Sequence, residues 1–98
     1  METQKIKTAV VILNWNGKNW LEKFLPNIIS NSLDSEIIIA DNNSSDDSIK
    51  FLKKNYPKIR IIKNNGNFGY AKGYNLALKQ INSEYYVLLN SDIKVTKN

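Results

Sequence analysis

Short apolar runs alternate along the chain with stripes of apolar residues at helical spacing. The runs predict strands over residues 8–13, 36–40, 59–62 and 85–89. The first run is rich in β-branched residues, and the first two are typical of buried parallel strands. Between the runs, apolar residues recur at helical spacing, which predicts helices over residues 20–29, 49–56 and 70–81. Pro26 lies inside the first stripe and predicts a kink or a break there.

This alternation predicts an α/β fold in a single domain that covers residues 1–98. Connections from strand to helix to parallel strand are right-handed in about 98% of cases, so we expect a parallel sheet with helices on both faces. The expected fold is therefore a Rossmann-like parallel sheet. Its carboxyl edge, where open α/β sheets bind ligands, would carry the polar turns that follow the strands.

Two acidic residues at strand ends are the main candidates for chemistry. Asp92 comes two residues after Asn90 and follows the last run; its carboxylate suits Mg²⁺ or Mn²⁺, which take further ligands from phosphates and water. Asp41 ends the second run, where an acid can accept a hydrogen bond from a base N–H or a ribose hydroxyl. For both residues a capped turn is the alternative interpretation, because Asn, Ser and Asp favour turns.

Other residues in the turns have both a functional and a structural interpretation. Trp15 can stack on a base or pack in the core. Lys72 belongs to the glycine-rich segment 66–73, which matches neither the dinucleotide fingerprint nor the P-loop, and it can face phosphates or lie in solvent. Ser44 or Ser45 is expected to cap the second helix. The positive end of the helix dipole, at the N-terminus, would favour the acidic residues Asp46 and Asp47 that follow.

Composition narrows the chemistry further. The chain has 98 residues without Cys or His, which excludes thiolate and imidazole metal sites and a Ser-His-Asp triad. Its apolar runs are far shorter than the ~20 residues of a membrane span, and we expect a cytoplasmic protein, at the inner membrane face in its full-length form. The net charge of +5 comes from a Lys-rich second half, which a solvated helix face explains better than a nucleic-acid partner does.

Four segments together resemble the nucleotide-binding half of a family-2 glycosyltransferase with the GT-A fold. They occur in the family's order and spacing, at residues 10–17, 37–48, 67–75 and 86–92. The Asn-Ser-Asp of the last segment is most similar to the rhamnosyltransferase-like branch. The resemblance implies a metal-dependent, inverting transfer of a sugar from a UDP- or dTDP-sugar to a hydroxyl of a glycan or a lipid-linked saccharide.

The resemblance also implies roles for single residues. The expected donor-binding residues are Leu13, Asn14, Trp15, Asp41, Asn42, Asn43, Ser45, Lys72, Asn75, Asn90, Ser91 and Asp92. The first three would line the pocket for the base, and Asp41 would bind the edge of the base within a loop that its neighbours shape. Asn90 would approach the ribose, and Asp92 would ligate the divalent cation.

Two departures from the family pattern concern this site. Asn90 stands where many members have Asp, which makes the cation more dependent on Asp92. Tyr74 stands where many members have a basic residue, and the nearest base is Lys72. No residue suits the role of catalytic base, so we expect the base beyond Asn98. We expect the chain to be a truncated N-terminal part that binds the donor without transferring sugar. An apolar face left exposed where the rest of the protein would pack would favour a homodimer.

Three other functions stay open at this point. A flavodoxin-like or other nucleotide-binding regulatory module shares the alternating pattern, although a phospho-receiver needs acids where this chain has Asn14, Trp15 and Asn16. A sugar nucleotidyltransferase needs a basic glycine-rich loop after the first run, where this chain has Lys18. A nucleic-acid-binding domain would use the Lys-rich half of the chain.

Overall fold

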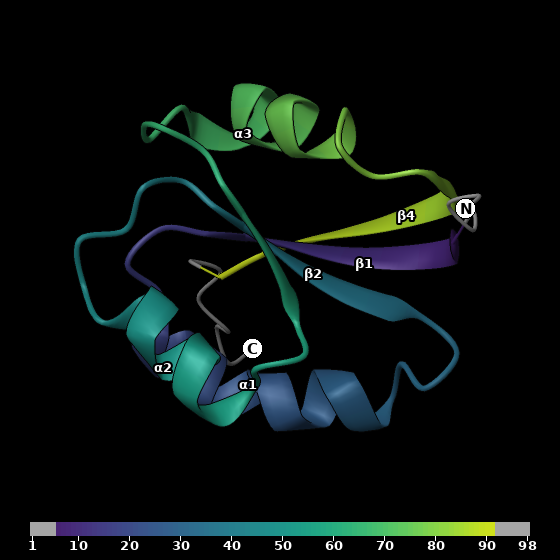
Figure 1. Ribbon diagram of the computed structural model, residues 1–98, viewed down its shortest axis with the longest axis horizontal. Coiled ribbons are helices and arrows are strands. Elements are labelled where there is room, and N and C mark those ends of the chain that lie inside the picture. The colour runs from purple at the N-terminus through teal and green to yellow at the C-terminus, as the bar shows by residue number, and fades with distance from the viewer. Residues whose placement is uncertain (1–5, 92–98) are drawn as a thin grey trace, which may run out of the picture.

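The structure is a computed structural model that describes residues 6–91 and contains one parallel sheet with helices on both faces (Figure 1). The strands are β1 (Ile6–Asn14), β2 (Glu36–Asp41), β3 (Arg60–Lys63) and β4 (Ser83–Asn90). The helices are α1 (Lys18–Ser30), α2 (Ser48–Asn55) and α3 (Gly69–Leu78). The predicted α/β class and Rossmann-like parallel sheet are confirmed.

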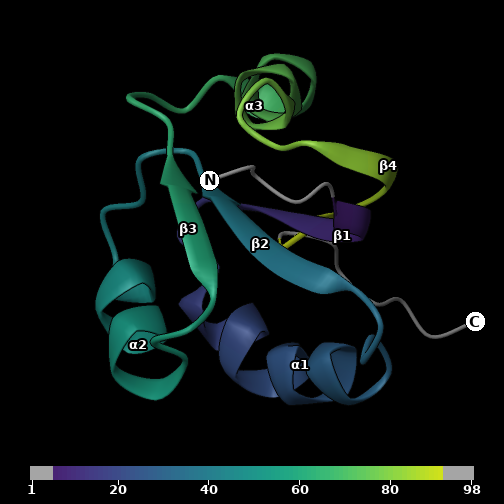
Figure 2. The ribbon, with the colours of Figure 1, turned by 45° about the vertical axis from the view of Figure 1, so that its right-hand side comes forward.

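The sheet has the strand order β3-β2-β1-β4, which places β1 in the centre and β4 at one edge of the described sheet. The helices α1 and α2 cover one face, and α3 covers the other (Figure 2). All neighbouring strands are parallel, so the carboxyl ends of β1, β2, β3 and β4 meet at the same edge. That edge carries the turns that the sequence singled out.

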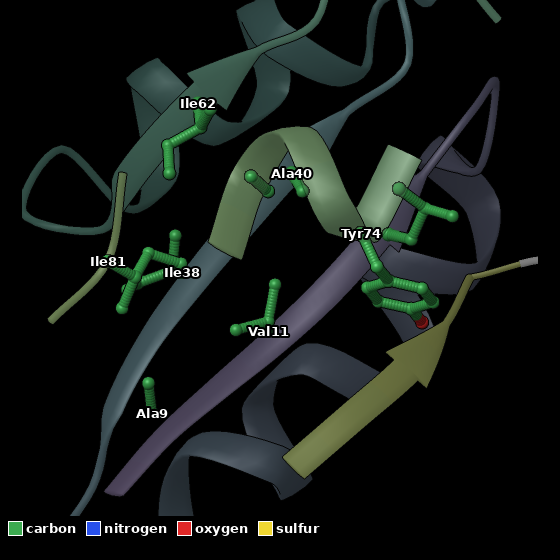
Figure 3. Close-up of a cluster of buried hydrophobic side chains, with 9 residues drawn as sticks. Ala9, Val11, Ile38, Ala40, Ile62, Tyr74 and Ile81 are labelled. Carbon is green, nitrogen blue, oxygen red and sulfur yellow. The ribbon is translucent and has the colours of Figure 1, made fainter. Parts of the chain in front are cut away.

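Each face of the sheet has its own hydrophobic core, because successive side chains of a strand point to opposite faces. On the α3 face, Val11 and Ile38 pack with Ala77 and Ile81 (Figure 3). On the other face, the fully buried Ile12 packs with residues of α1 and α2. Burying each such Leu or Ile side chain stabilises the fold by roughly 1.5–3 kcal/mol, which anchors the central strands on which the site is built.

Of the kink or break predicted at Pro26, the break is wrong, because α1 runs through it from Lys18 to Ser30; the kink stays a prediction. Proline lacks the N–H that would bond the carbonyl four residues earlier, which belongs to Glu22. Both residues are exposed, so water can satisfy that carbonyl and the helix continues.

The predicted cap of the second helix is also wrong. The helix α2 begins at Ser48 with Asp47 as its cap residue, and neither Ser44 nor Ser45 caps it. Both serines bind other turn residues instead, as described below.

None of the helices described between residues 6 and 91 is long and apolar enough to cross a membrane. The apolar residues Ile93 and Val95 also predict the start of a further strand, and both lie outside the described residues.

Candidate functional site

Each strand of the sheet ends in, or is followed directly by, a residue with an amide or a carboxylate. These residues are Asn14 on β1, Asp41 on β2, Asn64 after β3 and Asn90 on β4. The register places Asn14 opposite Asp41, and Leu13 opposite Asn90. Polar side chains from the whole width of the sheet therefore gather at its carboxyl edge.

Asn14 joins the ends of three strands. Its side chain is completely buried, and its Nδ2 donates to Asp41 Oδ1 at 2.9 Å. Its Oδ1 accepts from the Ser91 hydroxyl at 2.7 Å, while the Ser91 N–H donates to the Leu13 carbonyl at 2.9 Å. A Cβ on Gly17 would collide with Asn14 and Ser91, so the turn after β1 needs glycine at this position.

Asp41 holds the loop that follows β2. Its Oδ1 accepts from the Ser44 hydroxyl at 2.7 Å as well as from Asn14, and its Oδ2 accepts from the Ser44 N–H at 2.8 Å. Only 1% of Asp41 is exposed, so its charge depends on these donors in place of water. These bonds close a turn directly after Asp41, which agrees with the turn that the sequence offered as the alternative, and they fix the loop beside the end of β1.

Asn16 ties the turn after β1 to the same loop. It has a left-handed backbone with φ of 52°, which Asn tolerates better than most residues. From there its Oδ1 accepts from the main-chain N–H groups of Ser45 at 2.7 Å and Asp46 at 3.0 Å. Its own N–H donates to the Ser44 hydroxyl at 2.9 Å, so the two turns are joined from both sides.

Asp46 links the start of α1 to the start of α2. Its carboxylate accepts from the N–H and hydroxyl of Ser48 and from the Lys18 N–H. Partial burial by itself raises the pKa of Asp46, but the Ser48 and Lys18 hydrogen bonds and the Lys18 charge outweigh it, and the pKa lies below its ordinary value. A carboxylate at two helix N-termini also complements both helix dipoles.

A second buried layer connects the edge to α3. The Asn42 Oδ1 accepts from Asn64 Nδ2 at 2.7 Å, and Asn64 Nδ2 also lies 3.2 Å from the Gly73 carbonyl. A Cβ on Gly73 would lie 2.8 Å from Asn42 Nδ2 and 2.9 Å from Leu13 Cδ1. Gly73 therefore lets α3 approach the strand ends closely. Within residues 6–91, every buried side-chain N or O atom has a hydrogen-bond partner.

The exposed fraction of Trp15 shows that its core-packing interpretation is wrong. Trp15 follows the buried Asn14, yet 47% of its surface is exposed at the edge of the sheet. Leu13, by contrast, packs in the core under α3. Asn43 is exposed with a φ of 64°, and Ser45 is engaged with Asn16.

The predicted residues of α3 lie on its solvent side. Asn75 and Lys72 are both exposed, and the Lys72 ammonium lies 4.3 Å from the centre of the Phe68 ring. Asp92, the predicted metal ligand, lies outside the described residues. The structure therefore places Asn14 in direct contact with Asp41 on one side and with Ser91 on the other. Lys72 and Asn75 belong instead to the exposed surface of α3.

Three residues that hold the site together were not singled out for it by the sequence. They are Asn16, Ser44 and Asn64, and each bonds a residue from a different turn or strand. Their common signal is an amide or hydroxyl in or beside the turns at the carboxyl edge. Which partner each one takes depends on the strand order, which periodicity alone does not supply.

Comparisons with known proteins identify similar sequences and similar folds. The sequence profile described as Glycosyl transferase family 2 matches residues 9–98. An uncharacterized glycosyltransferase of Mycoplasma genitalium is 30% identical over 96 residues, which cover 89% of this chain and 32% of that protein. The chain thus spans about a third of the length of this relative.

Two solved structures have the same fold. Residues 1–349 of S. aureus TarS in complex with UDP have a TM-score of 0.73 and 23% identity, covering 88% of this chain and 27% of that TarS fragment. A mannosyltransferase of Pyrobaculum calidifontis in complex with GDP-Man and Mn²⁺ has a TM-score of 0.73 and 20% identity, covering 92% of this chain and 28% of that protein.

Proposed function

Because the chain belongs to glycosyl transferase family 2, we propose that it binds a nucleotide-diphosphate sugar at the carboxyl edge of its sheet. One observation carries the proposal: Asn14 bonds Asp41 on one side and Ser91 on the other, which joins the ends of β2, β1 and β4. Open α/β sheets bind ligands at this edge. The UDP and GDP-Man bound by the two structural neighbours support a nucleotide as the ligand.

The base of the nucleotide would lie beside Trp15 and Asp41. The exposed Trp15 indole offers an apolar face on which a base can stack. Asp41 Oδ2 accepts one hydrogen bond from within the protein, which leaves it capacity to accept a second from a base N–H. Uracil and thymine both present such an N–H, which is consistent with a UDP- or dTDP-sugar.

The diphosphate would lie toward Ser91 and Asp92, with Asp92 as the protein ligand of Mg²⁺ or Mn²⁺. A carboxylate is a suitable ligand for these hard cations, which usually complete their coordination with phosphate oxygens and water. The Mn²⁺ of the mannosyltransferase structure supports a divalent cation. When bound, the cation would supply positive charge that stabilises the diphosphate leaving group.

The complete protein would transfer the sugar with inversion. An acceptor hydroxyl of a glycan or lipid-linked saccharide attacks the anomeric carbon, and the bond from that carbon to the diphosphate oxygen breaks. The hydroxyl proton passes to a carboxylate base, and the nucleoside diphosphate leaves. Glu84 is unsuitable as that base because it lies near the amino end of β4, away from the site. We expect the base in residues beyond Asn98, together with the acceptor site.

The proposal also includes the wider properties expected from the sequence. They are a role in polysaccharide biosynthesis, a cytoplasmic location at the inner membrane face, no nucleic-acid partner and a homodimer. The rhamnosyltransferase-like branch stays a prediction. Family membership favours this function over a flavodoxin-like regulatory module or a sugar nucleotidyltransferase.

Calorimetric titration of the chain tests the cation and the nucleotide separately. We expect the wild-type chain to bind UDP- or dTDP-sugar more tightly with Mn²⁺ than with EDTA. Asp92→Ala should lose roughly tenfold or more in affinity with Mn²⁺, because the loss of one charge-assisted ligand costs about 1.4 kcal/mol or more. Its affinity in EDTA should stay close to that of the wild type.

Glu84→Ala is the matched control, since it removes a carboxylate at the other end of the same strand. Its affinity should equal that of the wild type in both conditions. A wild-type chain that binds no nucleotide would refute the proposed function. Equal affinity of the wild type and Asp92→Ala in Mn²⁺ would refute the metal role alone.

A further inference from the structure

Tyr74 contacts the end of β4 at Asn90, which is one of the proposed donor-binding residues. Only 9% of Tyr74 is exposed, and its ring extends from α3 across the sheet (Figure 3). Its hydroxyl lies 2.6 Å from the Leu89 carbonyl and also hydrogen-bonds Asn90 Oδ1. The one proton of this hydroxyl is shared between the two acceptors.

We propose that Tyr74 is a positioning residue that holds Asn90 by its Oδ1 and thereby turns the Asn90 NH₂ group toward the ligand. The proposal rests on the function proposed above. The acceptor oxygen and the donor NH₂ group of an amide are bonded to the same planar carbon and point in different directions. Because Oδ1 is bound to the Tyr74 hydroxyl, the NH₂ group is turned away from that hydroxyl.

This arrangement gives Asn90 a defined chemical role. An NH₂ group donates to oxygen atoms and does not coordinate a cation. Asn90 would therefore bind an oxygen acceptor of the donor nucleotide, such as a ribose hydroxyl, and leave the cation to Asp92. Tyr74 supplies the contact that sets this orientation.

The position of the residues within the fold makes the contact rigid. Tyr74 lies one residue after Gly73, whose missing Cβ allows α3 to sit directly against Leu13 and Asn42. On the neighbouring strand β1, Leu13 is in register with Asn90. The packing of α3 against Leu13 therefore holds Tyr74 and Asn90 close to each other. A side chain held in this way pays less entropy when it binds a ligand.

The contact itself can be tested without a nucleotide by NMR of the Asn90 side chain. In Tyr74→Phe, the Asn90 carbonyl carbon signal should shift and the amide should become more mobile on the ps–ns timescale, because Oδ1 loses its donor. Tyr86→Phe is the matched control: its hydroxyl donates to the Ile81 carbonyl at 2.8 Å near the other end of β4. The control should leave the Asn90 signals unchanged. Unchanged Asn90 signals in Tyr74→Phe would overturn the positioning role.

The orientation of the amide can be tested by UDP titration in EDTA, so that no cation contributes. Asn90→Asp replaces the outward NH₂ group with an oxygen and should weaken UDP binding roughly five- to tenfold, the effect of one lost hydrogen bond. Tyr74→Phe should weaken UDP binding in the same direction, while Tyr86→Phe should not. Unchanged or tighter binding by Asn90→Asp would overturn the inference, because Oδ1 would then face the ligand.

These outcomes are distinguishable from failure of the proposed function. A wild-type chain that binds no UDP would contradict the proposed function and the donor role of Asn90. The NMR comparison of Tyr74→Phe with Tyr86→Phe would still decide whether Tyr74 positions Asn90.

Discussion

At the scale of single residues, Asn14 shows why the edge of the sheet needs an amide and not an acid. Its Nδ2 donates to one neighbour, Asp41, and its Oδ1 accepts from another, Ser91. An Asp at this position could accept from Ser91 but could not donate to Asp41. The amide is therefore the group that lets one buried carboxylate remain charged at the centre of the site.

Replacing Asn14 with Asp tests this requirement. In Asn14→Asp, two carboxylates would face each other across the present 2.9 Å hydrogen bond, and burial prevents both from being charged. We expect a loss of roughly 2–4 kcal/mol in the free energy of unfolding at pH 7. A proton held between the two carboxylates would relieve their repulsion, so the loss should be smaller at pH 5 than at pH 7.

Urea denaturation at several pH values would measure both effects. Asn65→Asp is the control, because it makes the same substitution at an exposed loop position. The control should remain within about 0.5 kcal/mol of the wild type. An Asn14→Asp protein as stable as the wild type at pH 7 would show that Asn14 does not have this role.

At the scale of elements, the turns after β1 and β2 act as one structural unit. Asn16 binds the main chain of the loop after β2, and the Asp46 carboxylate bonds the first residues of both α1 and α2. These bonds satisfy N–H groups that helix geometry leaves without partners. The unit holds the two helices against each other and keeps the loop beside the proposed base site.

The lowered pKa of Asp46 predicts how this unit responds to acid. A group whose pKa is lower in the folded state contributes stability above its unfolded pKa of about 3.9 and loses it as the pH falls through the folded pKa. Asp46→Asn should therefore reduce the wild type's loss of stability between about pH 5 and 3. The effect should be about 0.5 kcal/mol or less because solvent screens this exposed carboxylate.

Denaturation midpoints at pH 5, 4 and 3 would measure the change. Asp47→Asn is the matched control, because Asp47 meets α2 through its main-chain carbonyl, which accepts from the Phe51 N–H. Its pH profile should follow that of the wild type. An Asp46→Asn profile that coincides with the wild type would contradict the assignment.

The elements themselves were predictable from the sequence, and the polar contacts between them were not. Apolar runs predicted the strands because the side-chain pattern of a strand is local to its own sequence. How far each strand is buried depends on its neighbours: most of β1 is buried, whereas the middle of β4 is exposed. The bond from Asn14 to Asp41 depends on β1 lying beside β2 in one register, which no local pattern encodes. For the same reason Ser44 was predicted as a helix cap: its preference for turns is local, but its partner Asp41 is set by the path of the loop.

At the scale of the whole molecule, the described sheet is covered unevenly. β1 is buried between two strands and two layers of helices, whereas β4 pairs with β1 along one side and has no second neighbour within residues 6–91. Four large side chains in the middle of β4 are more than a third exposed: Tyr85, Tyr86, Val87 and Leu88. An unpaired apolar strand is a template for another strand, so the proposed homodimer would form by pairing two β4 strands.

Leu88→Lys tests that association. Leu88 is 45% exposed on β4, and a charge there would have to be desolvated when a second strand pairs alongside it. The wild-type chain should show a sedimentation coefficient that rises with concentration, and Leu88→Lys should remain monomeric at the same concentrations. Leu33→Lys makes the same substitution at a more exposed leucine, 83% exposed, outside the strands, and should associate like the wild type. If the wild-type chain stays monomeric at every concentration, or if both variants lose association equally, β4 is not the surface that joins two chains.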